Sequence, residues 1–226
     1  MPTEIQRFKQ ALREHAADFR GQLQEADIER LANYYQLLLR WNPRLHLVAP
    51  CSPEEFATRH ILESLLLLPH LTNGARVIDV GSGAGLPIIP CLTIRADLHA
   101  TLIESSRKKS VFLREALRPL RGPEPPDLLT QRFEDTVAPP ADFVSCRALD
   151  RFQELLSRLI DWAPPSSTLL FFGGPVLLER IKGLVSSVQE ELIAGSEQRF
   201  LIVAERDSQF DGRFMPDKND PRKHTK

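Results

Sequence analysis

Hydrophobic positions in the first seventy residues recur at the spacing of amphipathic helices. Apolar residues three and four positions apart predict a first helix with one buried face; they are Ile5, Phe8, Leu12, Ala16 and Phe19. The same spacing predicts a second helix over 28–39, which we expect Pro43 to end. Ser52 suits an N-cap and Pro53 suits the first helical position, so a short third helix is expected to begin there. A fourth helix is expected over 59–68.

Beyond the helical segment, short β-branched and apolar runs alternate with helices. The expected strands are 75–80, 99–104, 128–131, 143–145, 168–172 and 199–204. The expected helices are 86–94, 106–120, 152–162 and 176–188. This alternation predicts a Rossmann-like α/β fold with a doubly wound, mostly parallel sheet. We therefore divide the chain into an N-terminal helical extension (1–70) packed on the core, an α/β domain (71–205) and a flexible polar tail (206–226).

A glycine-rich turn follows the first expected strand. It begins at Asp79 and carries glycines at Gly81, Gly83 and Gly85, which let a ligand approach the backbone closely because no Cβ intervenes. Dinucleotide sites use G-x-G-x-x-G, but Leu86 occupies the place of the third glycine. An acid two residues before G-x-G-x-G is typical of S-adenosylmethionine (SAM) sites, since a carboxylate complements the ammonium and sulfonium of SAM. The turn favours SAM over a nicotinamide cofactor; a purely structural glycine turn is the third interpretation.

Two further acids lie at successive strand ends. Glu104 closes the second expected strand, where a carboxylate can accept hydrogen bonds from both hydroxyls of a ribose. Glu134 follows Phe133 after the third strand, where SAM proteins commonly contact adenine. Each acid alone is also consistent with a solvated loop carboxylate. Together with Asp79 they favour a SAM site at the carboxyl edge of the sheet.

The residues at the end of the fourth strand narrow the reaction. Ser145-Cys146-Arg147-Ala148 stands where methyltransferases acting on exocyclic amines usually carry Pro-Pro-aromatic. Methylation of a pyrimidine at C5 needs a cysteine nucleophile; Cys51 and Cys91 are poorly placed, and Cys146 near the ligand edge is more consistent with a structural thiol. A ring nitrogen with a free lone pair needs no general base, because positioning against the sulfonium methyl does most of the catalysis.

Composition and charge restrict the class of protein. The 226 residues are 42% hydrophobic and 26% charged, which suits a folded protein and excludes disorder over most of the chain. A formal net charge of -1 excludes a general nucleic-acid coat but permits a local basic surface. Three cysteines without a C-x-x-C pair predict neither a disulfide framework nor a structural zinc site. The polar start and the short apolar runs favour a cytoplasmic protein without a membrane segment.

Several short stretches match the pattern of one known family. They are 38–42 (Leu-Leu-Arg-Trp-Asn), 59–65 (Arg-His-Ile-Leu-Glu-Ser-Leu), 77–87, 104–105, 108–109, 112–113 and 145–148. On these stretches, the chain resembles the ribosomal small-subunit RNA methyltransferase G family, also called glucose-inhibited division protein B, over about residues 30–205. The Trp-Asn and Arg-His-Ile elements are more specific than the glycine turn. The resemblance implies a class I SAM-dependent methyltransferase fold with a seven-stranded sheet, and N7 methylation of one guanine of 16S rRNA, guanine 527.

Positions of the site residues follow from the same resemblance. It implies SAM contacts at Gly81, Leu86, Phe133, Glu134 and Arg147, with Asp79, Gly83, Gly85 and Glu104 in the same pocket. Arg147 and His60 are candidates for positioning the substrate; an exposed cation and a structural histidine are the alternatives, and no catalytic residue is assigned. The expected partner is 16S rRNA within the small ribosomal subunit. We expect a monomer without a metal ion.

A cluster of basic residues is expected near the cofactor edge. Its members on the helix after the second strand are Arg107, Lys108, Lys109, Arg114 and Arg118, and the tail adds further basic residues over 213–226. The cluster predicts contacts with RNA phosphates, and a solvated helix face is the alternative interpretation.

Four positions depart from the family pattern. Ile88 replaces a glycine, 46–48 reads His-Leu-Val in place of Asn-Leu-Thr, Glu63 replaces aspartate, and Gly173 replaces the lysine of a Lys-Gly pair. If that lysine binds RNA, its loss favours an alternative function: a SAM-binding ribosome-associated factor with weak or no methyl transfer, or a small-molecule methyltransferase. A nicotinamide-dependent oxidoreductase is the third hypothesis.

Overall fold

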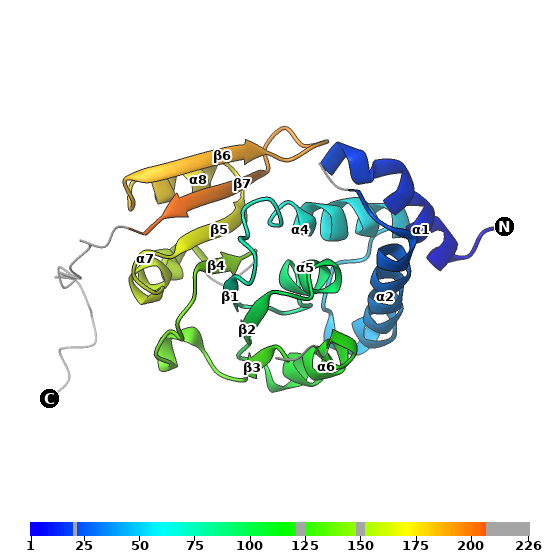
Figure 1. Ribbon diagram of the computed structural model, residues 1–226, viewed down its shortest axis with the longest axis horizontal. Helices are drawn as coiled ribbons and strands as arrows, with labels where there is room; N and C mark the ends of the chain where they lie inside the picture. Colours follow the sequence, from blue (N-terminus) through cyan, green and yellow to red (C-terminus); the bar gives the residue numbers. More distant parts are fainter. Residues whose placement is uncertain (20–21, 121–124, 148–151, 207–226) are drawn as a thin grey trace, which may run out of the picture.

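The computed structural model describes residues 1–19, 22–120, 125–147 and 152–206 of the chain (Figure 1). All of the expected tail except Arg206 lies outside this part, including its basic residues over 213–226. The seven strands are β1 (Arg76–Val80), β2 (His99–Ile103), β3 (Asp127–Leu129), β4 (Phe143–Cys146), β5 (Thr168–Gly173), β6 (Ser187–Leu192) and β7 (Phe200–Glu205). They form one sheet in the order β3-β2-β1-β4-β5-β7-β6. Only β7 runs antiparallel to its neighbours, so the predicted mostly parallel α/β sheet is confirmed.

The helices are divided between the two faces of the sheet. Their bounds are α1 (Glu4–His15), α2 (Glu25–Leu45), α3 (Pro53–Glu55), a π-helix (Phe56–Leu62), α4 (Glu63–Leu65), α5 (Ile88–Ile94), α6 (Arg107–Leu117), α7 (Phe152–Trp162) and α8 (Pro175–Lys182). Val77 packs in the core that includes α1, α2, α5 and α6, whereas its neighbour Ile78 packs in the core that includes α7 and α8. Successive strand residues point to opposite faces, so a central strand such as β1 supplies both cores.

Three predictions about the N-terminal helices are wrong. Helix α2 does not end at Pro43 but continues to Leu45, because a proline in the exposed last turn removes only one backbone hydrogen bond. His46 then ends the helix in the left-handed conformation, with φ of 48°. The third and fourth helices, expected to be separate, are one helical segment in which the π-helix joins α3 to α4. This segment ends at Leu65, short of the predicted residue 68. The predicted Ser52 cap is confirmed, since its side chain accepts a hydrogen bond from the Glu55 N–H.

One strand was missed in the C-terminal part. The helix predicted over 176–188 ends at Lys182, and residues 187–192 form β6. Four of these six residues are Ser, Gln or Glu, which is the composition of an edge strand with much of its surface in water. Such a strand lacks the continuous apolar run that identified the central strands. The remaining strands and helices lie within a few residues of their predicted bounds.

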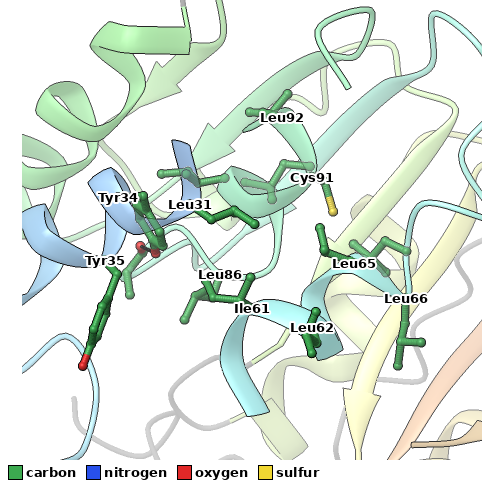
Figure 2. Close-up of a cluster of buried hydrophobic side chains, with 14 of the residues drawn as sticks. Leu31, Tyr34, Tyr35, Ile61, Leu62, Leu65, Leu66, Leu86, Cys91 and Leu92 are labelled. Atoms are coloured by element: carbon green, nitrogen blue, oxygen red, sulfur yellow. Dashed lines mark hydrogen bonds between the residues drawn. The ribbon is translucent and has the colours of Figure 1, made fainter. Parts of the chain in front are cut away.

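The N-terminal helices and one face of the sheet share a hydrophobic core. Figure 2 shows side chains of α2, the π-helix, α4 and α5 meeting around the glycine turn, with Tyr34, Ile61 and Leu86 among them. At the outer side, the rings of Phe8, Tyr35 and Phe56 stack with centroids 4.4 and 4.7 Å apart. Each of the three is at most 3% exposed. The extension is therefore held against the sheet by burial of large apolar side chains.

Truncation of the stacked ring in the π-helix tests this shared core. We expect Phe56→Ala to lower the free energy of unfolding by about 3–5 kcal/mol, because a fully buried ring is lost from a packed site. Urea unfolding followed by circular dichroism and by tryptophan fluorescence measures the effect. Val176→Ala, at an exposed position on α8, is the control and changes stability by less than about 0.5 kcal/mol. Two separate transitions in Phe56→Ala, with the sheet unaffected, would contradict a shared core.

Candidate functional site

A cavity of about 540 Å³ opens at the carboxyl ends of β1, β2 and β4. In doubly wound sheets this edge is where ligands bind. Residues from the N-terminal extension, the glycine turn, the ends of the strands and α7 line it: Leu47, Val48, His60, Val80, Gly81, Ser82, Gly83, Ala84, Leu86, Ile103, Glu104, Ser105, Lys109, Gln131, Arg132, Phe133, Glu134, Arg147, Leu155 and Arg158. The predicted SAM residues at Gly81, Gly83, Leu86, Glu104, Phe133, Glu134 and Arg147 are all in this set. Sequence reasoning therefore placed seven of its cofactor candidates around one cavity.

The glycine turn needs its glycines for conformational reasons. Gly81, Gly83 and Gly85 have φ values of 72°, 53° and 83°, a region that residues with a Cβ rarely adopt. A Cβ on Gly85 would lie 2.2 Å from the Ile89 side chain, so Gly85 allows close packing of α5 rather than lining the cavity. The hydroxyl of Tyr34 donates to the Ala84 carbonyl oxygen at 2.6 Å. This buried bond from α2 holds the turn from behind, and the helical spacing of the sequence did not identify it.

Glu104 connects the glycine turn to helix α6. Its carboxylate accepts hydrogen bonds from the backbone N–H of Gly83 at 2.8 Å and of Ser106 at 2.6 Å. The residue is only 6% exposed. A carboxylate held by two N–H groups at the end of β2 presents negative charge to the cavity in a fixed orientation. This position agrees with the predicted ribose contact, which stays a prediction.

Asp79 lies behind the glycine turn and does not line the cavity. The Ser145 hydroxyl of β4 donates to its Oδ1 at 2.7 Å, and among the described residues its buried Oδ2 has no hydrogen-bond partner. Burial raises the pKa of Asp79 to about 7, more than the hydrogen bonds from Ser145 and Ser82 lower it. The sequence placed Asp79 in the pocket as a contact for the cationic end of SAM. In the structure it supports the turn from below, and a direct contact stays a prediction.

Phe133 and Glu134 form the wall after β3. They begin a short 3₁₀ turn (Phe133–Asp135), and the buried Phe133 ring meets the edge of Trp162 at a centroid distance of 5.5 Å. Glu134 lies 3.8 Å from the guanidinium of Arg158 on α7. An apolar ring beside a carboxylate suits a planar base with exocyclic N–H groups.

The Trp-Asn element shapes the opposite wall. The Asn42 side-chain amide donates to the Val48 carbonyl oxygen at 3.1 Å, and its oxygen accepts from the Val48 N–H at 3.0 Å. Trp41 donates its indole N–H to Glu115 of α6 at 3.0 Å. These bonds fold the segment after α2 back so that Leu47 and Val48 reach the cavity. The sequence singled out the motif but not this role.

His60 and Arg147 meet at the boundary between the extension and the sheet. The guanidinium of Arg147, at the end of β4, donates to the backbone carbonyl oxygens of Arg59 and His60 and is paired with Glu63 at 3.1 Å. The His60 ring packs against Phe56 with centroids 5.1 Å apart. Burial, together with the positive charges of Arg147 and Arg59, lowers the pKa of His60 to about 4. His60 is therefore neutral at pH 7, so it is not present as an imidazolium that could donate a proton.

The predicted basic residues on α6 lie at one side of the opening. Lys109 lines the cavity, while Arg107, Lys108 and Arg114 are exposed on the same helix. Arg114 also donates to the Thr130 hydroxyl at 3.1 Å. Two exposed arginines that the sequence analysis did not select, Arg132 and Arg158, line the cavity as well. We call these cations at the cavity opening the rim; they are Arg107, Lys108, Lys109, Arg114, Arg132 and Arg158. The rim carries more positive charge than α6 alone, because residues distant in sequence meet at this edge.

Gly173, where the family pattern has lysine, is the last residue of β5. A Cβ there would lie 2.3 Å from the Leu177 side chain, so the present packing leaves no room for a side chain. Gly173 pairs with Phe200 of β7, and the adjacent Arg199 reaches the carboxylate of Glu63. Sequence spacing gives no indication of this long-range ion pair.

The residues of the cavity fit SAM. The positive φ at Gly81 and Gly83 keeps side chains off the path of a ligand, and a carboxylate stands at the end of β2 and after β3. Leu86, Ile103 and Phe133 supply apolar surface between them. This donor set suits a cationic amino acid joined to an adenosine better than a pyrophosphate, which two carboxylates would repel. Glu104 and Glu134 would hold the polar groups of the nucleoside.

In the described ranges no helix is both long and apolar enough to cross a bilayer. Within the same residues, no group of three or more His, Cys, Asp or Glu side chains is arranged to hold a metal ion.

A substitution in the glycine turn tests the cofactor site. We expect Gly83→Val to abolish SAM binding measured by calorimetry while leaving the circular dichroism spectrum unchanged, because valine at φ of 53° forces the turn to change shape. Gly195→Val is the matched control: Gly195 has φ of 70° and open space around it, and it does not line the cavity. Unchanged SAM affinity in Gly83→Val would mean that SAM binds elsewhere.

The buried carboxylate of Asp79 gives a pH prediction. Its pKa is about 7 in the folded state and near 3.8 unfolded, so its contribution to stability is present below pH 4 and is lost as the pH rises through 7. We expect Asp79→Asn to be more stable than the parent at pH 8 by at least about 1 kcal/mol, with the difference vanishing near pH 4. Urea unfolding at several pH values measures this difference. An equal difference at pH 4 and pH 8 would contradict the raised pKa.

Comparison with known proteins identifies the family. The model of the rRNA small subunit methyltransferase G family (GidB) matches residues 27–201. A protein of this name from Xanthomonas axonopodis pv. citri is 36% identical over 183 residues, 78% of this chain and 85% of its own length. One from Chromobacterium violaceum is 39% identical over 123 residues, which cover 54% of this chain and 58% of the relative.

Solved structures show the same fold at low sequence identity. The SAM-bound magnesium protoporphyrin IX methyltransferase of Synechocystis has a TM-score of 0.57 and 16% identity, covering 82% of this chain and 99% of its own. The ribosomal protein L11 methylase of Lactobacillus delbrueckii has a TM-score of 0.52 and 18% identity, covering 66% and 79%. The predicted class I methyltransferase fold is therefore confirmed. The chain belongs to the rRNA small subunit methyltransferase G family, and it is a SAM-dependent methyltransferase.

Proposed function

We propose that this protein transfers the methyl group of SAM to N7 of a guanine in 16S rRNA, guanine 527. The observation that carries the proposal is the composition of one cavity: a SAM-fitting interior with a neutral histidine and a rim of exposed cations. A relative that matches 78% of this chain is named as a ribosomal RNA small subunit methyltransferase. Guanine N7 carries a free lone pair, so its methylation needs no base to remove a proton first.

The chain's own residues would act mainly by positioning. When bound, SAM supplies a methyl group on a sulfonium sulfur, which a ring nitrogen can attack in line. Glu104 is committed to two backbone N–H groups and Glu134 faces Arg158, so both cavity carboxylates act as fixed acceptors rather than bases. Arg147 and His60 close the side of the cavity next to the extension. Holding nucleophile and methyl carbon in contact, away from water, supplies the rate acceleration.

The cationic rim would hold the phosphates that flank the target base. Arg107 and Lys108 stand exposed at the first turn of α6, next to Lys109 in the cavity wall. Arg132 and Arg158 stand at other parts of the wall. An RNA strand whose target base enters the cavity would run its backbone across these charges. With a net charge of -1, the protein would bind one structured site rather than coat RNA.

We also propose that the protein works as a monomer in the cytoplasm. The cavity is enclosed by elements of one chain, from the extension to α7, so a second copy is not needed to complete it.

Methyl transfer to ribosomal particles tests the proposed function. Small subunits that lack the modification are incubated with labelled SAM, and the modified base is mapped. Label at N7 of one guanine of 16S rRNA supports the proposal. Binding of SAM and subunits without transfer would select the noncatalytic alternative, which the missing lysine at Gly173 favours. Label found in small molecules alone would contradict the proposal and indicate a small-molecule methyltransferase.

Removal of two rim cations tests the RNA surface. We expect Arg107→Ala/Lys108→Ala to weaken binding to small subunits about tenfold and to lower the slope of log K against log salt by about 1–2, because two phosphate contacts are lost. The SAM dissociation constant should change less than about twofold, since both residues lie outside the cavity lining. Lys9→Ala/Arg13→Ala on α1 removes the same charge as the control. Equal weakening by both double variants would exclude a specific role of α6.

A further inference from the structure

Glu63 is a buried carboxylate that joins three parts of the chain. It begins α4 and is 2% exposed. One of its oxygens pairs with Arg147 at the end of β4, at 3.1 Å, and the other accepts from Arg199, which lies just before β7. Arg147 lines the cavity, whereas Glu63 and Arg199 do not. Glu63 therefore acts on the cavity only through its partners.

Arg147 is held from several directions at once. One of its terminal nitrogens donates to the Arg59 carbonyl and to Glu63, and the other donates to the His60 carbonyl and the Ser64 hydroxyl, both at 3.4 Å. Its guanidinium carbon also lies 5.4 Å from the centroid of the Phe172 ring on β5. These contacts fix a planar cation in one orientation at the cavity wall. Among the partners of Arg147 in the described residues, only Glu63 carries the opposite charge.

The bonds from Arg147 end on the turn that presents His60. Arg59 and His60 belong to the π-helix, a widened turn that occurs rarely and often at functional sites. His60 lines the cavity, and among the described residues its buried Nδ1 has no hydrogen-bond partner. A change in the placement of Arg147 would thus alter two cavity residues together. A buried ion pair is weak evidence for stability, so the arrangement calls for a functional explanation.

From these contacts we infer that Glu63 is a positioning residue for methyl transfer, whose carboxylate fixes Arg147 and, through it, the His60 turn in the cavity wall. The inference rests on the proposed function for its catalytic readout. A second readout is SAM affinity, which should depend on Glu63 because Arg147 lines the cofactor cavity. Measuring SAM affinity needs no RNA.

Removal of the charge of Glu63 is the first test. We expect Glu63→Gln to lower kcat at least about tenfold and to raise the SAM dissociation constant severalfold, while KM for small subunits stays within about twofold because the cationic rim is unchanged. Glu63→Asp, which keeps the charge, should recover part of both losses. Glu54→Gln is the control: Glu54 lies in α3 and pairs with Arg7 at 2.6 Å, away from the cavity. Wild-type values of kcat and SAM affinity in folded Glu63→Gln would overturn the inference.

A pH profile supplies a second test that does not depend on Glu63→Gln folding. Burial raises the pKa of Glu63, while Arg147, Arg199 and Arg59 lower it. Arg199→Gln removes one of these cations at a position about a third exposed, so it should raise that pKa further. Protonation of Glu63 removes the negative charge that attracts the guanidinium of Arg147. SAM affinity in Arg199→Gln should therefore match the parent near pH 8 and fall at a higher pH than in the parent as the solution is acidified.

The outcomes separate this inference from the proposed function. If the parent protein transfers no methyl group to subunits, the proposed function fails, and calorimetric SAM binding still tests Glu63. If the parent is active but Arg199→Gln and the parent show the same pH profile of SAM affinity, the positioning role is wrong. His60, the other titratable group near Arg147, has its pKa lowered to about 4, and charges from Glu55, Arg59 and Arg199 act on it too. His60→Asn identifies any share it has in the profile.

Discussion

The whole site depends on one constraint: the N-terminal helices and one face of the sheet share a single hydrophobic core. Tyr35 stacks on both Phe8 and Phe56. The same core includes Ile61 and Leu86, which Figure 2 shows together with Tyr35. Because the helices cannot leave the sheet without exposing these side chains to water, they form a permanent wall of the cavity. A cofactor pocket that a Rossmann-like sheet leaves open is thereby closed on one side.

Polar contacts then hold the backbone segments that line the cavity, which apolar packing alone does not orient. Tyr34 bonds to the glycine turn, Asn42 folds the chain back to bring Val48 to the cavity, and Arg147 bonds to the π-helix. The Tyr34 and Arg147 bonds join the extension to the sheet domain, and the Asn42 bonds hold residues 47–48 at the cavity. Once they are ionised, the buried carboxylates of Asp79 and Glu63 oppose stability, as their raised pKa values indicate. The structure keeps charge next to the cavity at a cost in folding free energy.

The sequence was sufficient for the central fold and for the cofactor side of the site. Continuous apolar strands, the glycine turn and the acids at strand ends depend on local chemistry, so Gly81, Glu104 and Glu134 were placed correctly around one cavity. The sequence was insufficient where tertiary packing overrides local preference. Pro43 did not end α2, and the polar residues 187–192 formed an edge strand. Long-range partners such as Arg199 for Glu63 leave no pattern in a single sequence.

Amide hydrogen exchange with and without SAM tests most directly that the extension and the sheet form one cavity. SAM should slow exchange in the glycine turn (81–85) and, at the same concentrations, in the segments that reach the cavity from the extension, 47–48 and 59–63. Joint protection of these segments is the expected result. Protection confined to the turn and the strand ends, with the extension exchanging as in the free protein, would contradict a shared cavity.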